Sequence, residues 1–201
     1  MPSVKVLFIG NSFTYYNEIW SVFQKIVYSA GKNVDVDAVY EGSYRLYMFA
    51  DPSDPKGAIV EQKLAESDYD IVFIQEQSTD PLTNYSSFLN GATSLYNKIK
   101  ADNAETRVIL YQTWARKTGS DTLTSHGWTN ESMTHDLEQA YAKVGQALGV
   151  DVSPAGTAFF DVYSHHGSTI ELYDADLQHP SAIGTYLAAL VDAQTALEST
   201  H

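Results

Sequence analysis

A serine near the start of the chain and an Asp-x-x-His sequence near its end are the residue types of a nucleophilic hydrolase. Ser12 follows an apolar run and the turn residues Gly10 and Asn11. Asp176 and His179 stand three residues apart, just before a final apolar segment. A serine hydroxyl becomes nucleophilic when a histidine takes its proton, and that histidine needs an acid to orient it. Together the residues predict a Ser-His-Asp site that works through an acyl-enzyme.

Each of these residues also has a simpler interpretation when it is taken alone. A serine after a strand is commonly the N-cap of the next helix. Asp176 could form an Asx turn, and His179 could be a loop histidine before a helix that Ser181 caps. The joint presence of all three catalytic types favours the catalytic interpretation over these separate ones.

Apolar runs that alternate with helical periodicity indicate how the chain positions these residues. Strands are expected at 4–9, 34–39, 69–74, 107–113 and 150–152, and helices at 15–30, 58–67, 85–101, 131–148 and from 181 onward. Loops or irregular segments are expected at 44–57 and between 117 and 128, and a helix end followed by a loop is expected at 163–167. This order predicts a single α/β domain over residues 1–201, a three-layer α/β/α sandwich on a parallel sheet. Ligands bind at the carboxyl edge of such a sheet.

Composition excludes several classes of function. The chain has 201 residues, a hydrophobic fraction of 44% and a formal net charge of −13. The charge opposes binding to nucleic acid or to an anionic membrane, so a small-molecule or oligosaccharide substrate is expected as partner. The absence of cysteine excludes a thiolate nucleophile and cysteine-ligated metal sites. No signal peptide is visible, so we expect a cytoplasmic protein, or a secreted or periplasmic one if a leader has been removed.

The order of these features resembles the SGNH (GDSL-like) hydrolase superfamily over essentially the whole chain, from Gly10 to Ser181. Gly10-Asn11-Ser12 matches the Gly-Asp-Ser block, Gly42 matches the second-block glycine, and Asp176 with His179 matches the Asp-x-x-His block. The resemblance implies a flavodoxin-like sheet of five strands and hydrolysis of esters without a cofactor. It also implies that Ser12 is the nucleophile, His179 the general base and Asp176 its orienting acid. The backbone amides of Ser12 and Gly42 would be oxyanion donors.

The third block departs from the family pattern. Gln75-Glu76-Gln77-Ser78 stands where the family has Gly-x-Asn-Asp, so a glutamine would supply the side-chain oxyanion donor. Gln77 falls at the position of the family asparagine. Gln75 projects to the same side by strand periodicity and stays an alternative. Asn11 in place of aspartate is a second departure.

The sequence Gln-Glu-Gln-Ser, with Trp114-Ala115-Arg116 and the closing His-Pro-Ser, resembles a bacterial carbohydrate-esterase-like subgroup. This implies short-chain acyl esters, above all acetylated carbohydrates, as substrates. Asn11, Trp114 and Trp128 are the candidate substrate contacts. Packing in the core or at its rim is the commoner role of such tryptophans, and it stays open for Trp114 and Trp128.

Two rival functions belong to other classes. One is a metal-dependent hydrolase, since carboxylates and imidazoles bind zinc or manganese. Its ligands would be Asp174, Asp176 and His179, with His165 or His166. The other is a non-enzymatic flavin- or phosphate-binding module that uses the turn 12–14 after the first strand.

Overall fold

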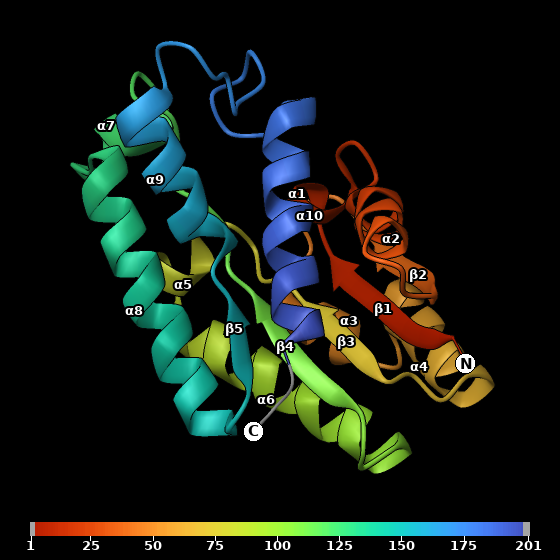
Figure 1. Cartoon of the computed structure of the whole chain (residues 1–201). Helices are drawn as coiled ribbons and strands as arrows, with labels where there is room; N and C mark the ends of the chain where they lie inside the picture. Colours follow the sequence, from red (N-terminus) through yellow and green to blue (C-terminus); the bar gives the residue numbers. More distant parts are fainter. Residues whose placement is uncertain (1–2, 199–201) are drawn as a thin grey trace.

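Five parallel strands form the middle layer of the protein in the computed structural model, which describes residues 3–198 (Figure 1). Their order is β2-β1-β3-β4-β5, the order of flavodoxin-like sheets. The strands are β1 (Val4–Gly10), β2 (Val34–Tyr40), β3 (Ile71–Ile74), β4 (Arg107–Tyr111) and β5 (Asp151–Ser153). The predicted fold class is therefore confirmed.

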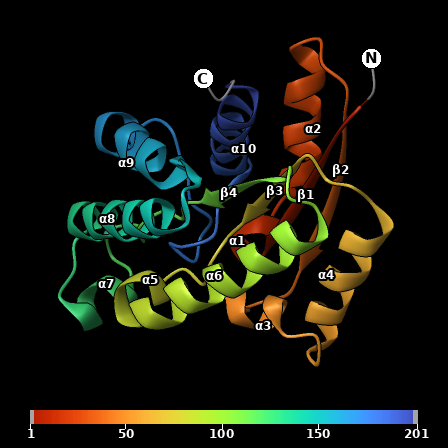
Figure 2. The same ribbon diagram turned by 90° about the horizontal axis from the view of Figure 1, so that it is seen from below.

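Helices cover both faces of this sheet (Figure 2). One face carries α1 (Ser12–Tyr15), α2 (Ile19–Ser29), α9 (Ala155–His166) and α10 (Ala182–Leu197). The other face carries α3 (Leu46–Ala50), α4 (Pro55–Glu66), α5 (Asp80–Thr83), α6 (Tyr85–Asp102), α7 (Asp121–His126) and α8 (Asn130–Leu148). Within residues 3–198, no helix has both the length and the apolar character that crossing a membrane requires.

The central strand β1 is apolar on both faces because its side chains pack against the helical layers on both sides of the sheet. Leu7 and Ile9 point into the core under α4 and α6, while Val6 and Phe8 point into the core under α2 and α10. Phe8 stacks on Phe73 of β3 with ring centroids 4.7 Å apart. This burial explains why the strand reads as a continuous apolar run rather than an alternating one.

Several helix boundaries differ from those expected. The helix expected at 15–30 begins only at Ile19, because Asn17 and Glu18 have left-handed φ angles of 55° and 51° that interrupt it. The segment 44–57 contains α3, and α4 begins at Pro55, where the Asp54 side chain accepts from the Lys56 amide. The stretch expected to be irregular contains α7, and α5 was also missed.

Candidate active site

The turn after β1 is held by side chains of its own and of β3. Asn11 accepts a hydrogen bond from the Phe13 amide, which caps α1, and its Nδ2 donates to the Tyr44 carbonyl at 3.0 Å. Asn11 is 1% exposed, so its side chain supports the turn. The prediction that Asn11 contacts substrate is therefore wrong. A Cβ at Gly10 would lie 2.2 Å from the Thr14 hydroxyl, so the turn requires glycine there.

Three side chains from the two ends of the chain form a continuous hydrogen-bonded series. The Nε2 atom of His179 lies 2.8 Å from the Oγ atom of Ser12, and its Nδ1 atom is hydrogen-bonded to the Asp176 carboxylate. A donor at Nδ1 leaves Nε2 free to accept the serine proton. The order is that of a nucleophile, a general base and an orienting acid.

The carboxylate of Asp176 is fixed in its charged form. Desolvation opposes the charge, but hydrogen bonds from the His179 side chain and from the amides of His179 and Gln178 outweigh it. They lower the pKa of Asp176 to about 2. Between the two residues, Leu177 has a left-handed φ of 64°, which turns the chain back so that both side chains meet. An anion beside Nδ1 stabilises the imidazolium that forms when His179 takes a proton.

The two backbone amides expected to bind the oxyanion differ in whether they are already hydrogen-bonded. The amide of Ser12 has no hydrogen-bond partner among residues 3–198. The amide of Gly42 donates to the carboxylate of Glu41 at 3.0 Å. This hydrogen bond is the largest cause that lowers the pKa of the Glu41 carboxylate. The second cause is the Lys56 ammonium, which lies 3.3 Å from the other carboxylate oxygen. The Gly42 amide therefore already binds an anionic oxygen, and Glu41 would have to leave it before substrate could use it.

The two glutamines after β3 differ in whether their side-chain Nε2 donors are free. Gln75 is fully buried; its Oε1 accepts from the Asn11 amide and the Thr14 hydroxyl, and its Nε2 donates to Asn11 Oδ1 and the Glu76 carbonyl. Gln77 uses only its Oε1, which accepts from the amides of Thr79 and Asp80 at the start of α5. Its Nε2 has no partner in the described part of the chain. The free donor is on Gln77, whereas Gln75 holds the Ser12 turn.

Two buried charged residues, which the sequence motifs contain but to which no role was assigned, support the same edge. Glu76 accepts from the Leu46 amide at 3.2 Å and from the Gln77 amide at 2.6 Å, and burial raises its pKa to about 7. Arg116 donates to the Ser78 hydroxyl and lies with Cζ 5.3 Å from the Phe13 ring centre. Its Nε and Nη1 are buried without partners, and burial lowers its pKa to about 10. A hydrophobic pattern gives no sign of either role.

The candidate substrate contacts on tryptophan are not supported by burial or position. Trp114 is fully buried, stacks on Phe159 at 4.1 Å and donates from Nε1 to the Gln178 carbonyl. Its substrate role is therefore wrong, and it holds the loop that carries His179. Trp128 stacks on His126 at 4.2 Å and lines a hollow of about 290 Å³ formed by α5, α6 and α8. No contact joins it to Ser12.

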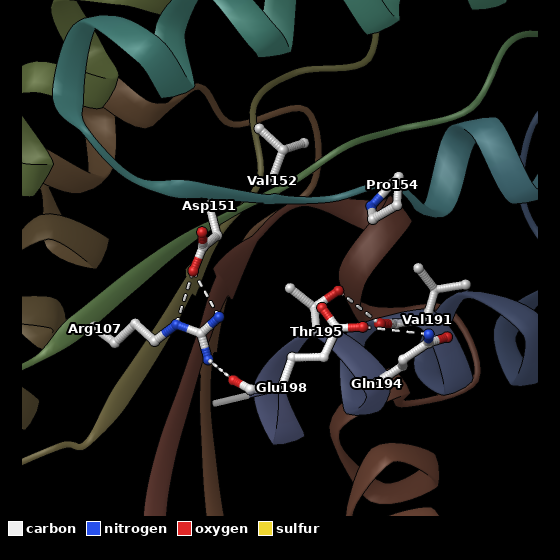
Figure 3. A pocket seen from close by; sticks show the side chains of 8 residues that line it. All are labelled: Arg107, Asp151, Val152, Pro154, Val191, Gln194, Thr195 and Glu198. Atoms are coloured by element: carbon white, nitrogen blue, oxygen red, sulfur yellow. Dashed lines mark hydrogen bonds and ion pairs between the residues drawn. The ribbon is translucent and has the colours of Figure 1, made fainter. Parts of the chain in front are cut away.

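A cavity of about 340 Å³ lies at the opposite, amino edge of the sheet (Figure 3). Arg107 and Asp151 line it at the starts of β4 and β5 and form an ion pair at 2.6 Å, and Glu198 lines it directly after the end of α10. Its lining contains no serine or histidine, so it lacks the serine and imidazole of the predicted site. This cavity is therefore not where Ser12, His179 and Asp176 meet.

The rival interpretations find little support in the described residues. Residues 3–198 contain no group of three or more His, Asp or Glu side chains arranged to hold a metal ion, so Asp174, Asp176 and His179 do not form one. His165 instead bonds to Asp161 within α9. In the turn 12–14, the Phe13 amide is bonded to Asn11 and the Thr14 hydroxyl to Gln75, so neither is free for a phosphate.

Comparison with solved structures finds the same fold in several proteins. A protein of Slackia heliotrinireducens, named as a candidate SGNH hydrolase, matches with a TM-score of 0.85 and 27% identity over 97% of this chain and 100% of that one. A DUF4886 family protein of Bacteroides uniformis matches with a TM-score of 0.81 and 20% identity, over 98% and 83% of the two chains. A carbohydrate esterase family 3 protein of Talaromyces cellulolyticus gives 0.70 and 17%, over 96% of each. No protein-family model and no curated protein matches the chain.

Proposed function

Because this structural evidence supports the SGNH hydrolase superfamily, as the sequence predicted, we propose that the protein is a serine ester hydrolase. The observation that carries the proposal is the placement of Ser12 Oγ 2.8 Å from His179 Nε2, with Asp176 on the other ring nitrogen. This distance lies within the range for proton transfer from a nucleophile to its base. The named relatives likewise support a hydrolase.

In the first half of the reaction, His179 takes the proton of Ser12 as its oxygen attacks the acyl carbon of the ester. The tetrahedral oxyanion would be held by the amides of Ser12 and Gly42 and by Nε2 of Gln77. Collapse breaks the bond to the alcohol, which leaves with the proton from His179. Each oxyanion donor could contribute about 3 kcal/mol in the transition state.

In the second half, water attacks the acyl-enzyme while His179 accepts its proton. The bond between the acyl group and Ser12 then breaks, and the serine recovers its proton from His179. Asp176 stays ionised throughout and stabilises the imidazolium in both halves.

Short-chain esters of carbohydrates are the substrate class that the surroundings of Ser12 support best. Tyr15 lies 5.5 Å from Tyr40, and Tyr40 stacks on Trp20 at 5.0 Å, which forms an aromatic row beside the nucleophile turn. Tyr40 is exposed, and the Lys56 ammonium lies 5.7 Å from its ring centre. Aromatic surfaces with adjacent polar groups suit sugar rings, which have apolar faces and hydroxyl edges. The carbohydrate esterase with the same fold agrees with this class.

A substrate scan tests the proposal. Wild-type protein and the Ser12→Ala variant, as the inactive control (the blank), would be assayed on p-nitrophenyl esters of increasing acyl length and on acetylated xylan. Each assay would be run with and without chelator. We expect kcat/KM to fall as the acyl chain lengthens, acetate to be released from xylan, and chelator to change nothing. Turnover that persists in the blank would contradict the serine mechanism, and turnover that chelator abolishes would favour the metal-dependent alternative.

The carbohydrate part has its own matched test. Tyr40→Ala should raise KM for an acetylated xylo-oligosaccharide about fivefold and leave p-nitrophenyl acetate unaffected, because only the sugar would meet the aromatic row. The control is Tyr28→Ala, because Tyr28 is also exposed but lies near the end of α2, two turns after Trp20. Equal effects of Tyr40→Ala on both substrates would contradict a sugar-binding row.

A further inference from the structure

The break between α1 and α2 has an unusual backbone. Asn17 and Glu18 follow one another with φ angles of 55° and 51°, and neither is glycine. A left-handed conformation costs an ordinary residue roughly 1–2 kcal/mol, somewhat less for asparagine. A conformation of this cost persists only where surrounding contacts determine it, and such sites cluster near function.

The contacts that determine this break come from the far end of the chain. The Nδ2 atom of Asn17 donates to the Pro180 carbonyl at 3.1 Å and to the Thr185 hydroxyl at 3.0 Å. The Thr185 hydroxyl in turn donates to the Tyr16 carbonyl at 3.4 Å. The side chain of Asn17 therefore joins the segment that follows Ser12 to the residue that follows His179.

A second contact crosses the same gap through rings. Tyr16 stacks on the imidazole of His179 with centroids 4.0 Å apart and planes 12° from parallel. Phe13 lies 5.5 Å from the same imidazole. The ring of His179 is thus contacted by Tyr16 and Phe13, which both belong to the segment that carries Ser12.

We propose that Asn17, Tyr16 and Thr185 are positioning residues that set the distance and angle between Ser12 and His179. We name the three residues the α1–α10 brace. The inference rests on the proposed function for its catalytic consequence. Ser12 stands on the four-residue helix α1 and His179 on a loop, so few local contacts fix either one relative to the other. A displacement of about 1 Å between reacting groups can cost about a hundredfold in rate.

The first test replaces Asn17 by glycine, which keeps the left-handed backbone and removes the amide. We expect Asn17→Gly to lower kcat about 10- to 100-fold with KM within about twofold, because binding is untouched while the reacting atoms are displaced. Glu18→Gly is the matched control; it relieves the same backbone conformation one residue later, and the Glu18 side chain makes no hydrogen bond among the described residues. Its kcat should equal that of the wild type.

Two further pairs separate the hydrogen bonds from the rings and keep the test usable if Asn17→Gly does not fold. Thr185→Val should lower kcat, while Thr195→Val, which loses only a bond to Val191 within α10, should not. Tyr16→Leu should lower kcat, while Tyr16→Phe, which keeps the stacked ring, should restore it. If all brace variants retain wild-type kcat, the proposal is overturned.

A readout that does not depend on turnover completes the test. Nitrogen-15 NMR of His179 in the whole protein reports its tautomer and the proton shared between Nδ1 and Asp176. We expect one tautomer and a protected proton in the wild type and in Glu18→Gly, and exchange between states in Asn17→Gly. An unchanged signal in Asn17→Gly would overturn the brace even if activity fell. Ser12→Ala could keep full turnover while the His179 signal of Asn17→Gly shows exchange between states. In that case the proposed function is wrong and the positioning role of the brace is supported.

Discussion

The two edges of the sheet differ in how their charged groups and hydrogen-bond donors are paired. At the amino edge, Arg107 donates from Nε and Nη2 to Asp151 and from Nη1 to the carbonyls of Ala196 and Glu198, so each of its three guanidinium nitrogens has a partner. At the carboxyl edge, the Ser12 amide, Nε2 of Gln77 and two nitrogens of Arg116 have no partner among the described residues.

Backbone conformation follows the same division. Four non-glycine residues between 3 and 198 have left-handed φ angles: Asn17, Glu18, Ser43 and Leu177. All four stand in loops at the carboxyl edge, beside Ser12, Gly42 or His179. The comparison teaches that unused donors and costly backbone mark the reactive edge, whereas the cavity of Figure 3 lies at the edge where Arg107 is paired with Asp151.

The strongest way to break this comparison is to remove one residue from each edge. Ser12→Ala should fold normally and lose at least about three orders of magnitude in kcat, as single deletions of such residues do. Arg107→Ala should keep kcat and lose about 1 kcal/mol of stability, which is about 2–4 °C in Tm. Ester kinetics and thermal unfolding of both variants decide it, and a large kcat loss in Arg107→Ala would contradict the assignment of the edges.

The pH dependence of the carboxyl edge comes next in size. Because Asp176 keeps its charge down to about pH 2, it should contribute no proton to the acid limb of kcat/KM between pH 4 and 8. Asp176→Asn should lower the plateau about a thousandfold. The same carboxylate contributes stability that is complete above about pH 4, the unfolded value, and is lost as pH falls through about 2. An acid limb that loses one proton in Asp176→Asn would contradict this, because it would show that Asp176 titrates between pH 4 and 8.

The two glutamines sharpen the comparison within the reactive edge. Gln77→Glu keeps the oxygen that accepts from Thr79 and Asp80 but loses the Nε2 donor, so kcat should fall about a hundredfold at nearly constant Tm. Gln75→Glu loses two buried hydrogen bonds at the Ser12 turn, so it should lower the free energy of unfolding by about 1–3 kcal/mol. If Gln75→Glu lost turnover at unchanged stability, the donor would be Gln75.

The smallest effect expected is a gain. Glu41 occupies the Gly42 amide that the oxyanion would need, so Glu41→Ala should raise kcat/KM about two- to fivefold. Glu61→Ala, which removes another glutamate paired with a lysine, is the control and should have no effect on kcat/KM. A loss of activity in Glu41→Ala would show that the carboxylate supports the loop rather than blocking it.

The sequence predicted the layers and the residues that converge, for reasons that the structure makes plain. Strands β1, β3 and β4 are buried on both faces and so read as apolar runs, and parallel strands bring their following residues to one edge. The short helices α3, α5 and α7 were missed because four to six residues carry too little periodicity.

The rest of the site depends on partners that lie far apart in the chain. The brace joins Asn17 to Pro180 and Thr185, which lie 163 and 168 positions farther along the chain. No local sequence pattern predicts contacts over such a separation. Trp114 gave no sign in the sequence of whether it faced solvent or core, and Gln75 and Gln77 could not be separated until the hydrogen bonds of their side chains were known.

The central claim is that His179 and Asp176 make Ser12 a nucleophile, and covalent labelling tests it most directly. A fluorophosphonate reacts with an activated serine, so intact mass followed by peptide mapping should find one adduct, on Ser12, formed as ester turnover is lost. The adduct should be absent in Ser12→Ala and form far more slowly in His179→Ala. Full ester turnover with Ser12 unmodified, or an inactivating adduct on another residue, would contradict the account.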